Sequence, residues 1–325
     1  MSCRVPKELI DFIRKYPLYI IAGHLEPDGD CVASQLAAES ILKRLGKETF
    51  CVSPGPFTRP EIEAYREQFS SAVPEEILER NPAVLILDSS TFERVGDLAP
   101  VLENLPQAVI DHHSSGKRFG TVAWVEPRLP ATAMLIYYLA EALSVPLQSY
   151  EAELLLFGIA TDTGFFRHLE AHSGDVFEAV SKLTDAGASP KETYLNIFGN
   201  RTVESRILLG KLLGRVESLY GGKLLMTFET EDETTEYGIE NRDSDTLYML
   251  LQGVGGAEAV VLVREEGSGE CSVGLRSNTL AVGEIAREFG GGGHVLAAGF
   301  SYQGPLLEIY SILKTRFGTI LSGEN

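Results

Sequence analysis

The sequence has few positive charges, few cysteines and no long apolar run. It holds 28 Lys and Arg against 46 Asp and Glu in 325 residues, a formal net charge of −18. Tight non-specific binding to long nucleic acid needs many contacts between Lys or Arg and phosphate, and an anionic membrane surface attracts the same basic groups. The charge balance therefore argues against both partners, and on its own gives no reason to expect any phosphate-bearing ligand.

The four cysteines are widely spaced, and no C-x-x-C pair occurs among them: Cys3, Cys31, Cys51 and Cys271. Neither a zinc knuckle nor a disulfide framework is predicted, and reduced thiols are expected. The N-terminal residues lack the apolar segment of a signal peptide, and apolar runs such as residues 154–160 are too short to span a bilayer. We expect a cytoplasmic protein without a membrane anchor.

Short aliphatic runs alternate with amphipathic stretches in the first half of the chain. Strands are predicted over residues 18–22, 84–87 and 108–110, and helices over 31–45, 131–143 and 151–159. This alternation predicts an α/β fold, a parallel sheet with helices on both faces. Ligands of such sheets bind beyond the carboxyl ends of the strands.

The pattern changes near residue 200, and at about 150 residues per domain the length suggests two domains. We predict a metal-binding catalytic domain over 1–200, a linker helix over 201–218 and a smaller α/β substrate-binding domain over 219–325. One helix is expected over 203–219, followed by strands over 223–228, 259–263 and 271–275. Eight carboxylates against one Arg between Glu229 and Asp245 are interpreted as a solvated face or helix start.

The segment from His24 to Asp30 follows one predicted strand and precedes a predicted helix. Histidine and aspartate are good ligands for divalent cations, and Pro27 and Gly29 bend the loop so that the carboxylates of Asp28 and Asp30 can converge. A helix N-cap would also explain Asp30, but it leaves His24 unexplained.

Three further segments bring ligand-type side chains to the same edge of the predicted sheet. Asp88 follows the second strand, Asp111-His112-His113 follow the third, and Asp162 ends an apolar helix. Alone, Asp88 could be a strand-ending residue that caps the next turn. Together, six side chains suit two ions with one bridging carboxylate: His24, Asp28, Asp30, Asp88, His112 and Asp162. Two ions about 3.5–4 Å apart can activate water for phosphoryl transfer, and mixed imidazole and carboxylate ligation favours Mn²⁺ over Mg²⁺.

A glycine run at Gly290–Gly293 precedes His294 in the second half of the chain. Glycines expose backbone N–H groups to an anion, and His294 can donate to a phosphate oxygen. Most glycine runs are flexible loops, but the small residues at 297–299 indicate tight packing here. Arg276 and Ser277 follow a predicted strand and could bind phosphate, whereas a surface ion pair would equally explain Arg276.

These motifs together resemble the DHH phosphoesterase family with its DHH-associated C-terminal domain. The N-terminal family motifs match His24–Asp30, Asp88, Asp111–His113 and Asp162–Gly164 in the family's order, and the motif Gly-Gly-Gly-His-x-x-Ala-Ala-Gly matches Gly291–Gly299. The resemblance covers nearly the whole chain, and its two-domain layout is most similar to the NrnA-type enzymes. RecJ exonucleases are longer, and family II pyrophosphatases have a different C-terminal domain.

The resemblance implies a role for each position. One Mn²⁺ would be bound by His24, Asp28 and Asp88, and a second by Asp30, Asp88, His112 and Asp162. His113 would stabilise the charge of the scissile phosphate or protonate the leaving group, and Asp111 would orient the histidines. The substrate's terminal phosphate or backbone would be bound by Arg276, Ser277, Gly291, Gly292, Gly293 and His294. Val295 stands where NrnA-type relatives often have a basic residue, which bears on substrate preference and not on the metal chemistry.

The resemblance therefore implies a Mn²⁺-dependent phosphoesterase that hydrolyses short oligoribonucleotides, pAp or linear dinucleotides. The alternatives are a cyclic di-AMP phosphodiesterase, an inactive nucleotide sensor, which would lack a metal ligand, and a pyrophosphatase, which the glycine-rich motif disfavours. A short substrate needs few phosphate contacts, so the acidic surface is compatible with it. We expect no partnership with long nucleic acid or membrane; a homodimer and the order of substrate preference stay open.

Overall fold

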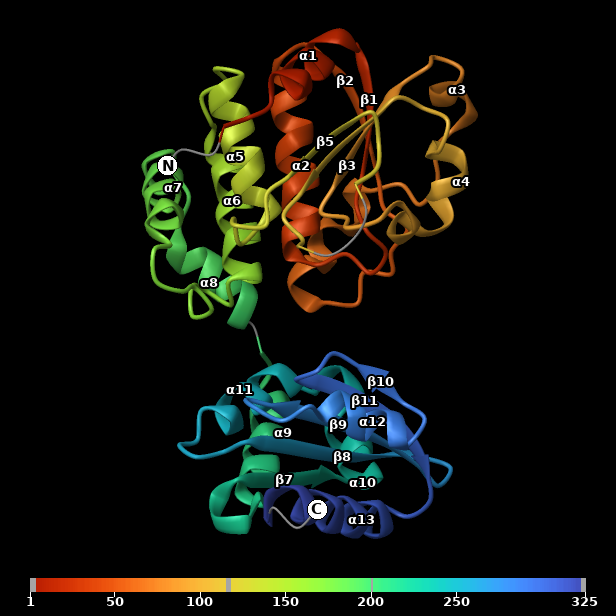
Figure 1. Ribbon diagram of the computed structural model, residues 1–325, viewed down its shortest axis with the longest axis vertical. Coiled ribbons are helices and arrows are strands. Elements are labelled where there is room, and N and C mark those ends of the chain that lie inside the picture. Colours follow the sequence, from red (N-terminus) through yellow and green to blue (C-terminus); the bar gives the residue numbers. More distant parts are fainter. Residues whose placement is uncertain (1–3, 115–117, 200, 323–325) are drawn as a thin grey trace. The chain divides into compact units, whose positions relative to one another are not determined.

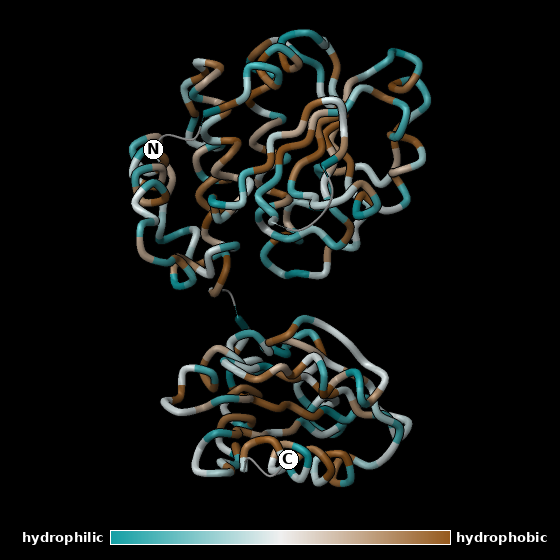
Figure 2. The backbone as a smooth tube through the Cα atoms, viewed as in Figure 1, coloured by the Kyte–Doolittle hydropathy of each residue, from teal (hydrophilic) through white to brown (hydrophobic). Residues whose placement is uncertain are grey.

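The computed structural model describes residues 4–114, 118–199 and 201–322. The chain divides into two compact units, residues 1–199 and residues 200–325. Figure 1 shows that each unit contains its own β-sheet with helices packed against it. In Figure 2 the strands of both sheets are largely apolar, as expected for sheets that are covered on both faces.

The sheet of the first unit is parallel throughout, in the order β2-β1-β3-β4-β5. Its strands are β1 (Leu18–Ala22), β2 (Glu48–Val52), β3 (Ala83–Leu87), β4 (Gln107–Asp111) and β5 (Val122–Val125). The predicted α/β fold is confirmed. The short edge strands β2 and β5 were not predicted, because neither forms the continuous aliphatic run that marks a buried central strand.

Helices cover the two faces of this sheet unequally (Figure 1). The larger apolar cluster lies on the face covered by α1 (Lys7–Lys15), α2 (Gly29–Arg44), α5 (Thr132–Ala142) and α6 (Ser149–Asp162). The other face has a smaller cluster under α3 (Glu75–Leu78), α4 (Ala99–Leu102) and the 3₁₀ helix η2 (Phe92–Leu98). The 3₁₀ helix η1 (Pro60–Gln68), α7 (Gly174–Asp185) and α8 (Pro190–Phe198) complete the unit.

The strand order reverses between β1 and β3. From β1 the chain crosses to the edge strand β2, and from β3 it crosses in the opposite direction to β4. In open parallel sheets the loops that leave such a pair diverge and create a crevice at the carboxyl ends, where ligands bind. The residues that follow β1 and β3 therefore lie at the position where this fold builds its sites.

The second unit contains a mixed six-stranded sheet, in the order β10-β11-β9-β8-β7-β6. Only β7 and β8 pair in parallel among these strands. Its strands are β6 (Glu217–Leu219), β7 (Leu224–Glu229), β8 (Ala259–Gly267), β9 (Glu270–Ser277), β10 (Gly292–Gly293) and β11 (Ala297–Gln303). One face packs against α9 (Val203–Gly214) and α11 (Ser244–Gln252), and the other against α12 (Val282–Glu288) and α13 (Leu306–Ser322). The short elements are α10 (Glu231–Tyr237), η3 (Tyr220–Gly222) and η4 (Ile239–Asn241).

One local prediction for this unit is wrong, and another holds in part. The single helix expected over 203–219 ends at Gly214, because residues 217–219 pair with β7 as an edge strand, and α9 packs its leucines into the core of the second unit. The acidic stretch does contain helix starts, as expected, because Glu231, Asp232 and Glu233 form the first turn of α10, but it is not wholly solvated, since Glu229 and Glu233 are buried. Glu229 accepts hydrogen bonds from Arg242 and Arg264 at 2.7 Å each.

None of the helices in the described part of the chain combines the length and the apolar character that a membrane-spanning helix needs.

Candidate functional site

Asp88 lies at the centre of a cluster of His and Asp side chains, directly after β3. It is 1% exposed, and its φ of +57° is a strained backbone conformation that Asp tolerates better than most residues. Its N–H donates to the carbonyl of Ile110 at 3.0 Å, and the Thr132 hydroxyl donates to its Oδ1 at 3.0 Å. This turn holds the carboxylate in the crevice between β1 and β3.

His24 approaches Asp88 from the end of β1. Its Nδ1 lies 2.7 Å from the carbonyl oxygen of Leu25, which can only accept, so Nδ1 carries a proton, and in the neutral imidazole Nε2 offers a lone pair. Nε2 lies 3.6 Å from Oδ2 of Asp88 and 3.8 Å from Oδ2 of Asp28. These separations exceed a hydrogen bond. Atoms that each lie about 2 Å from one ion can be up to about 4 Å apart, so the spacing leaves room for a cation.

The two carboxylates at the start of α2 have different partners. Asp28 is the N-cap, because it accepts from the Cys31 N–H at 3.1 Å; the alternative reading of Asp30 as the cap is wrong. Asp30 lies in the first turn, fully buried, and accepts from the N–H groups of Thr132 at 2.5 Å and Ala133 at 2.9 Å. The start of α5 thus fixes the orientation of Asp30.

His112 and Asp162 close the cluster on the other side of Asp88. His112 Nε2 lies 3.2 Å from Oδ2 of Asp162 and 3.5 Å from Oδ1 of Asp88. Asp162 is the last residue of α6, as the sequence predicted. A Cβ added at Gly158 would lie 2.8 Å from Oδ1 of Asp30, so this glycine lets α6 approach α2 closely.

The electrostatics of the cluster favour a bound positive charge. Burial and the neighbouring charges of Asp88 and Asp162 raise the pKa of Asp30. Burial and Asp88 likewise raise the pKa of Asp162, although His112 opposes the shift. Burial lowers the pKa of His112, but the hydrogen bond to Asp162 and the surrounding carboxylates raise it to about 10. A divalent cation would relieve the same repulsion without protons, so the residues present fit a metal site.

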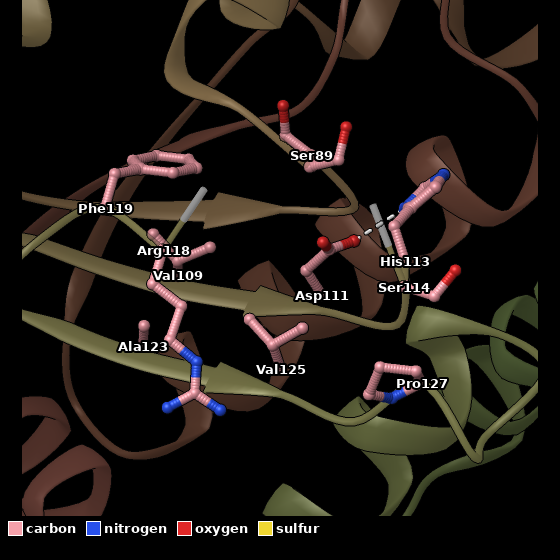
Figure 3. A pocket seen from close by; sticks show the side chains of 11 residues that line it. Ser89, Val109, Asp111, His113, Ser114, Arg118, Phe119, Ala123, Val125 and Pro127 are labelled. Carbon is pink, nitrogen blue, oxygen red and sulfur yellow. Dashed lines mark hydrogen bonds and ion pairs between the residues drawn. The ribbon is translucent and has the colours of Figure 1, made fainter. Parts of the chain in front are cut away.

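Asp111 and His113 form a second arrangement beside the cluster (Figure 3). Asp111 ends β4 and is buried, and its Oδ1 accepts from Nδ1 of His113 at 2.7 Å. His113 is partly exposed, and its Nδ1 also lies 3.7 Å from Oδ1 of Asp88. The carboxylate therefore fixes the orientation of an accessible imidazole next to Asp88.

The structure brings all the predicted metal ligands together, and it adds Cys31, which the sequence did not single out. Three sets have ligand atoms within 4.8 Å of one another: His24, Cys31 and Asp88; Asp88, His112 and His113; and Asp30, His112 and Asp162. Asp28 joins them through His24. The sequence predicts only an ordinary reduced thiol at Cys31, and its position next to Asp30 is the one signal that could have indicated its place in the cluster. Burial raises the pKa of its thiol to about 11, so at neutral pH it stays a protonated neighbour of His24.

The predicted phosphate-binding residues of the second unit lie near one end of its sheet. The guanidinium of Arg276, on β9, lies 4.5 Å from the ring centre of Tyr248. The loop that follows β10 lies beside this end of β9, because the Ser277 N–H donates to the Leu296 carbonyl at 2.9 Å. Ser277 itself is buried, and its hydroxyl donates to the Glu258 carbonyl and accepts from the Leu280 N–H. A direct substrate contact of that hydroxyl would have to replace these bonds.

The glycine-rich motif forms a tight hairpin. A Cβ at Gly291 would lie 2.2 Å from the Gly299 carbonyl oxygen, and one at Gly293 would lie 2.6 Å from that of Ala297. The His294 N–H donates to the Ala297 carbonyl at 2.8 Å, and the His294 side chain is exposed. The tight packing predicted from the small residues is therefore present, and it leaves the His294 side chain accessible.

Comparison with known proteins identifies the family. Residues 19–159 match the DHH family, N-terminal domain, and residues 221–315 match the DHHA1 domain. A protein of Thermus thermophilus named bifunctional oligoribonuclease and PAP phosphatase NrnA is 34% identical, over 89% of this chain and 85% of the relative. The chain belongs to the DHH family. The predicted NrnA-like DHH protein with a DHHA1 domain is confirmed, and with it the class of hydrolase that acts on phosphoester bonds.

Solved structures share the architecture of this DHH protein. An exopolyphosphatase-related protein from Bacteroides fragilis superposes with a TM-score of 0.78 at 18% identity, over 97% of this chain and 96% of the other. A RecJ exonuclease bound to manganese superposes with a TM-score of 0.52 at 17% identity, over 97% of this chain and 93% of the other. At these identities the likeness supports the fold.

Proposed function

We propose that this DHH protein is a Mn²⁺-dependent phosphoesterase that hydrolyses short oligoribonucleotides, pAp or linear dinucleotides. The observation that carries the proposal is the placement of Asp88 between two imidazoles. Its two carboxylate oxygens face His24 Nε2 at 3.6 Å and His112 Nε2 at 3.5 Å. A carboxylate with one oxygen toward each ligand set is the donor that a two-ion site needs at its centre. The name of the Thermus thermophilus relative supports the substrate class.

The ligand sets follow from the same distances. His24, Asp28 and Asp88 would bind one ion, and Asp30, Asp88, His112 and Asp162 would bind the other. Each imidazole has its Nε2 directed at carboxylates, and the Leu25 carbonyl orients His24 from its far side. When bound, the ions would lower the pKa of a water and neutralise charge on the phosphate.

His113 is the proposed catalytic residue of the protein itself. Because Asp111 holds Nδ1–H, the other nitrogen, Nε2, can face the substrate and carry the transferred proton. The imidazole held in this way can stabilise charge on the phosphate or protonate the leaving oxygen. Asp111 acts here as a positioning residue, because it affects the reaction through the imidazole of His113.

The DHHA1 domain would supply the groups that bind the end of the substrate. Arg276 offers a guanidinium whose face rests on Tyr248 and whose Nη1 donates to the Leu275 carbonyl at 3.0 Å; its remaining N–H groups would bind a phosphate. The exposed imidazole of His294 and the backbone of Gly291, Gly292 and Gly293 add further donors, whereas Ser277 would act mainly by shaping the turn after β9. With so few basic groups, the domain suits a substrate of a few nucleotides. The cytoplasmic location and the homodimer stay predictions.

A substrate panel tests this proposal. Purified protein with Mn²⁺ is given pAp, pApA, an RNA 5-mer, an RNA 24-mer, cyclic di-AMP and pyrophosphate, and initial rates are compared. We expect turnover of pAp, pApA and the 5-mer, with rates that fall as the RNA lengthens. Dominant hydrolysis of cyclic di-AMP would reassign the substrate, and no turnover of any nucleotide by metal-loaded protein would refute the proposal.

A further inference from the structure

A pocket of about 210 Å³ opens beside the Asp111–His113 pair. Figure 3 shows His113 and Asp111 at one end of it and Phe119 at the other, with Ser89 above and Val125 below. No role has been given so far to the part of the pocket that lies beyond His113. Its lining, besides those residues, comprises Ser90, Val109, Ser114, Arg118, Ala123 and Pro127.

The pocket exists because helices do not cover the whole sheet face. Val109 and Asp111 on β4 pair with Ala123 and Val125 on β5, so these four side chains point to one face. The apolar cluster under η2 and α4 covers β2, β1, β3 and β4, and Phe92, Phe119 and Ala123 pack against it; the ring centres of Phe92 and Phe119 are 5.7 Å apart. Ala123 and Val125 remain partly exposed at the edge strand.

The lining combines an apolar floor with hydroxyl groups. Val109, Ala123 and Val125 form a flat surface, and the Phe119 ring and Pro127 stand beside it. The hydroxyls of Ser90 and Ser114 lie on the walls, and Ser89 donates to the Thr91 carbonyl at 2.9 Å, so it can still accept. An apolar floor with a few hydrogen-bonding groups is the lining that binds a planar, neutral ring.

The pocket does not suit a second phosphate. Its inner end carries the Asp111 carboxylate, which repels anions and is already bonded to His113. Of the two basic side chains in the lining, His113 is already bonded to Asp111, and Arg118 is exposed, with its guanidinium pointing away from His113 in Figure 3. An anion would therefore gain little there, whereas an uncharged ring would bury the exposed faces of Ala123 and Val125.

We propose that this pocket binds the nucleoside whose phosphoester is cut, with the base over Val109, Ala123 and Val125. The proposal rests on the proposed function, because it takes His113 as the residue next to the scissile phosphate. From there the pocket extends along the sheet face to Phe119, and its volume suits one nucleoside rather than a dinucleotide. With one such pocket, the enzyme requires a base on its substrate but accepts different bases.

Adenosine binding tests the pocket apart from catalysis. The full chain in EDTA is titrated with adenosine, which carries no phosphate, and the fluorescence of Trp124 is followed. Trp124 is the only tryptophan in the sequence and lies on β5 between Ala123 and Val125, so it reports on that strand. The variant Ala123→Phe fills the floor, Phe119→Ala removes the aromatic wall, and Thr121→Phe adds the same ring at an exposed position outside the lining.

We expect Ala123→Phe to weaken adenosine binding about tenfold or more, Phe119→Ala to weaken it severalfold, and Thr121→Phe to leave it unchanged. With Mn²⁺, Ala123→Phe should raise KM for pAp by a similar factor. Thermal unfolding of each variant checks the fold, and Phe119→Ala keeps the test valid if Ala123→Phe does not fold. Equal binding by wild type and both pocket variants, or no adenosine binding at all, would overturn the pocket assignment. Pocket-specific adenosine binding without turnover of any nucleotide would instead refute the proposed function alone.

Discussion

Nδ1 of His113 lies 2.7 Å from Oδ1 of Asp111. The carboxylate is buried at the end of β4 while the imidazole is partly exposed, so the pair connects the sheet to the space where a substrate would lie. The rigid strand thereby determines both the orientation of the ring and which nitrogen carries the proton.

Asp111→Asn should lower kcat by about 10- to 100-fold, with a smaller change in KM, because the amide keeps the shape but loses the charge-assisted hydrogen bond that orients the His113 imidazole. Initial rates on pAp over a range of pH measure this. Asp97→Asn, at an exposed position in η2, is the matched control and should leave kcat unchanged. If Asp111→Asn retained the wild-type rate, Asp111 would have no part in positioning His113.

Mn²⁺ should stabilise the first unit against unfolding. The carboxylates of Asp30 and Asp162 have raised pKa values because burial and neighbouring charges disfavour ionisation, and a bound cation removes that cost. At a free concentration 100 times Kd, the gain is about 2.7 kcal/mol. Differential scanning fluorimetry with Mn²⁺ and with EDTA measures the rise in Tm, and the rise should shrink in Asp88→Asn. An unchanged Tm across a wide range of Mn²⁺ concentrations would argue against a metal in this cluster.

Gly274→Ala should weaken substrate binding from a distance. A Cβ at Gly274 would lie 2.0 Å from the Tyr248 hydroxyl, so the ring that supports the Arg276 guanidinium has to move. We expect KM for pAp to rise about tenfold with kcat nearly constant. A change of this size matches the free energy of a lost cation–π contact. Tyr248→Leu should produce the same split between KM and kcat.

Gly210→Ala is the control for that change, because no atom lies within 4 Å of the added Cβ and alanine favours the helix. It should leave both kinetic constants unaltered. An unchanged KM in both Gly274→Ala and Tyr248→Leu would remove Tyr248 from the positioning of Arg276.

Glu229→Gln should reduce the stability of the second unit in a pH-dependent way. Burial raises the pKa of Glu229, but Arg264 and Arg242 outweigh burial and lower it below the ordinary value of 4.5. The unfolded chain therefore binds this proton more tightly, so the stabilisation is present above about pH 4.5 and is lost as the pH falls through the lowered pKa.

The variant should lose about 3 kcal/mol at pH 7, since two largely buried guanidinium groups lose their common charged partner, and its stability should approach that of wild type as the pH falls below the lowered pKa of Glu229. Urea unfolding between pH 7 and 3 measures both effects. Asp232→Asn, an exposed neighbour, should show neither. A constant difference across the pH range would mean that the charge of Glu229 contributes nothing.

The elements that carry the metal cluster could be predicted from the sequence, because local patterns specify them. Residues 18–22 and 83–87 are continuous aliphatic runs, which is how strands buried on both faces read, and each is followed closely by a ligand-type residue. The apolar helix before Asp162 was equally clear. Since parallel strands share one carboxyl edge, the convergence of His24, Asp88 and His112 followed from topology alone.

The remaining contacts depend on residues far apart in the chain. Asp30 is oriented by N–H groups of Thr132 and Ala133, about 100 positions away, and no local pattern signals that contact. Glu229 is buried only because arginines of two other segments surround it. The pocket beside His113 depends on the pairing of β5 with β4, which no local pattern of the sequence signals.

The most direct test of the central claim compares phosphate release from pAp by wild type and Asp88→Asn, each with Mn²⁺ and with EDTA. The wild type should turn over only with Mn²⁺. Asp88→Asn should be slower by more than about 100-fold at saturating metal, because the carboxylate between the two ligand sets is lost. Equal rates for the two proteins, or full wild-type activity in EDTA, would contradict a metal-dependent phosphoesterase built around Asp88.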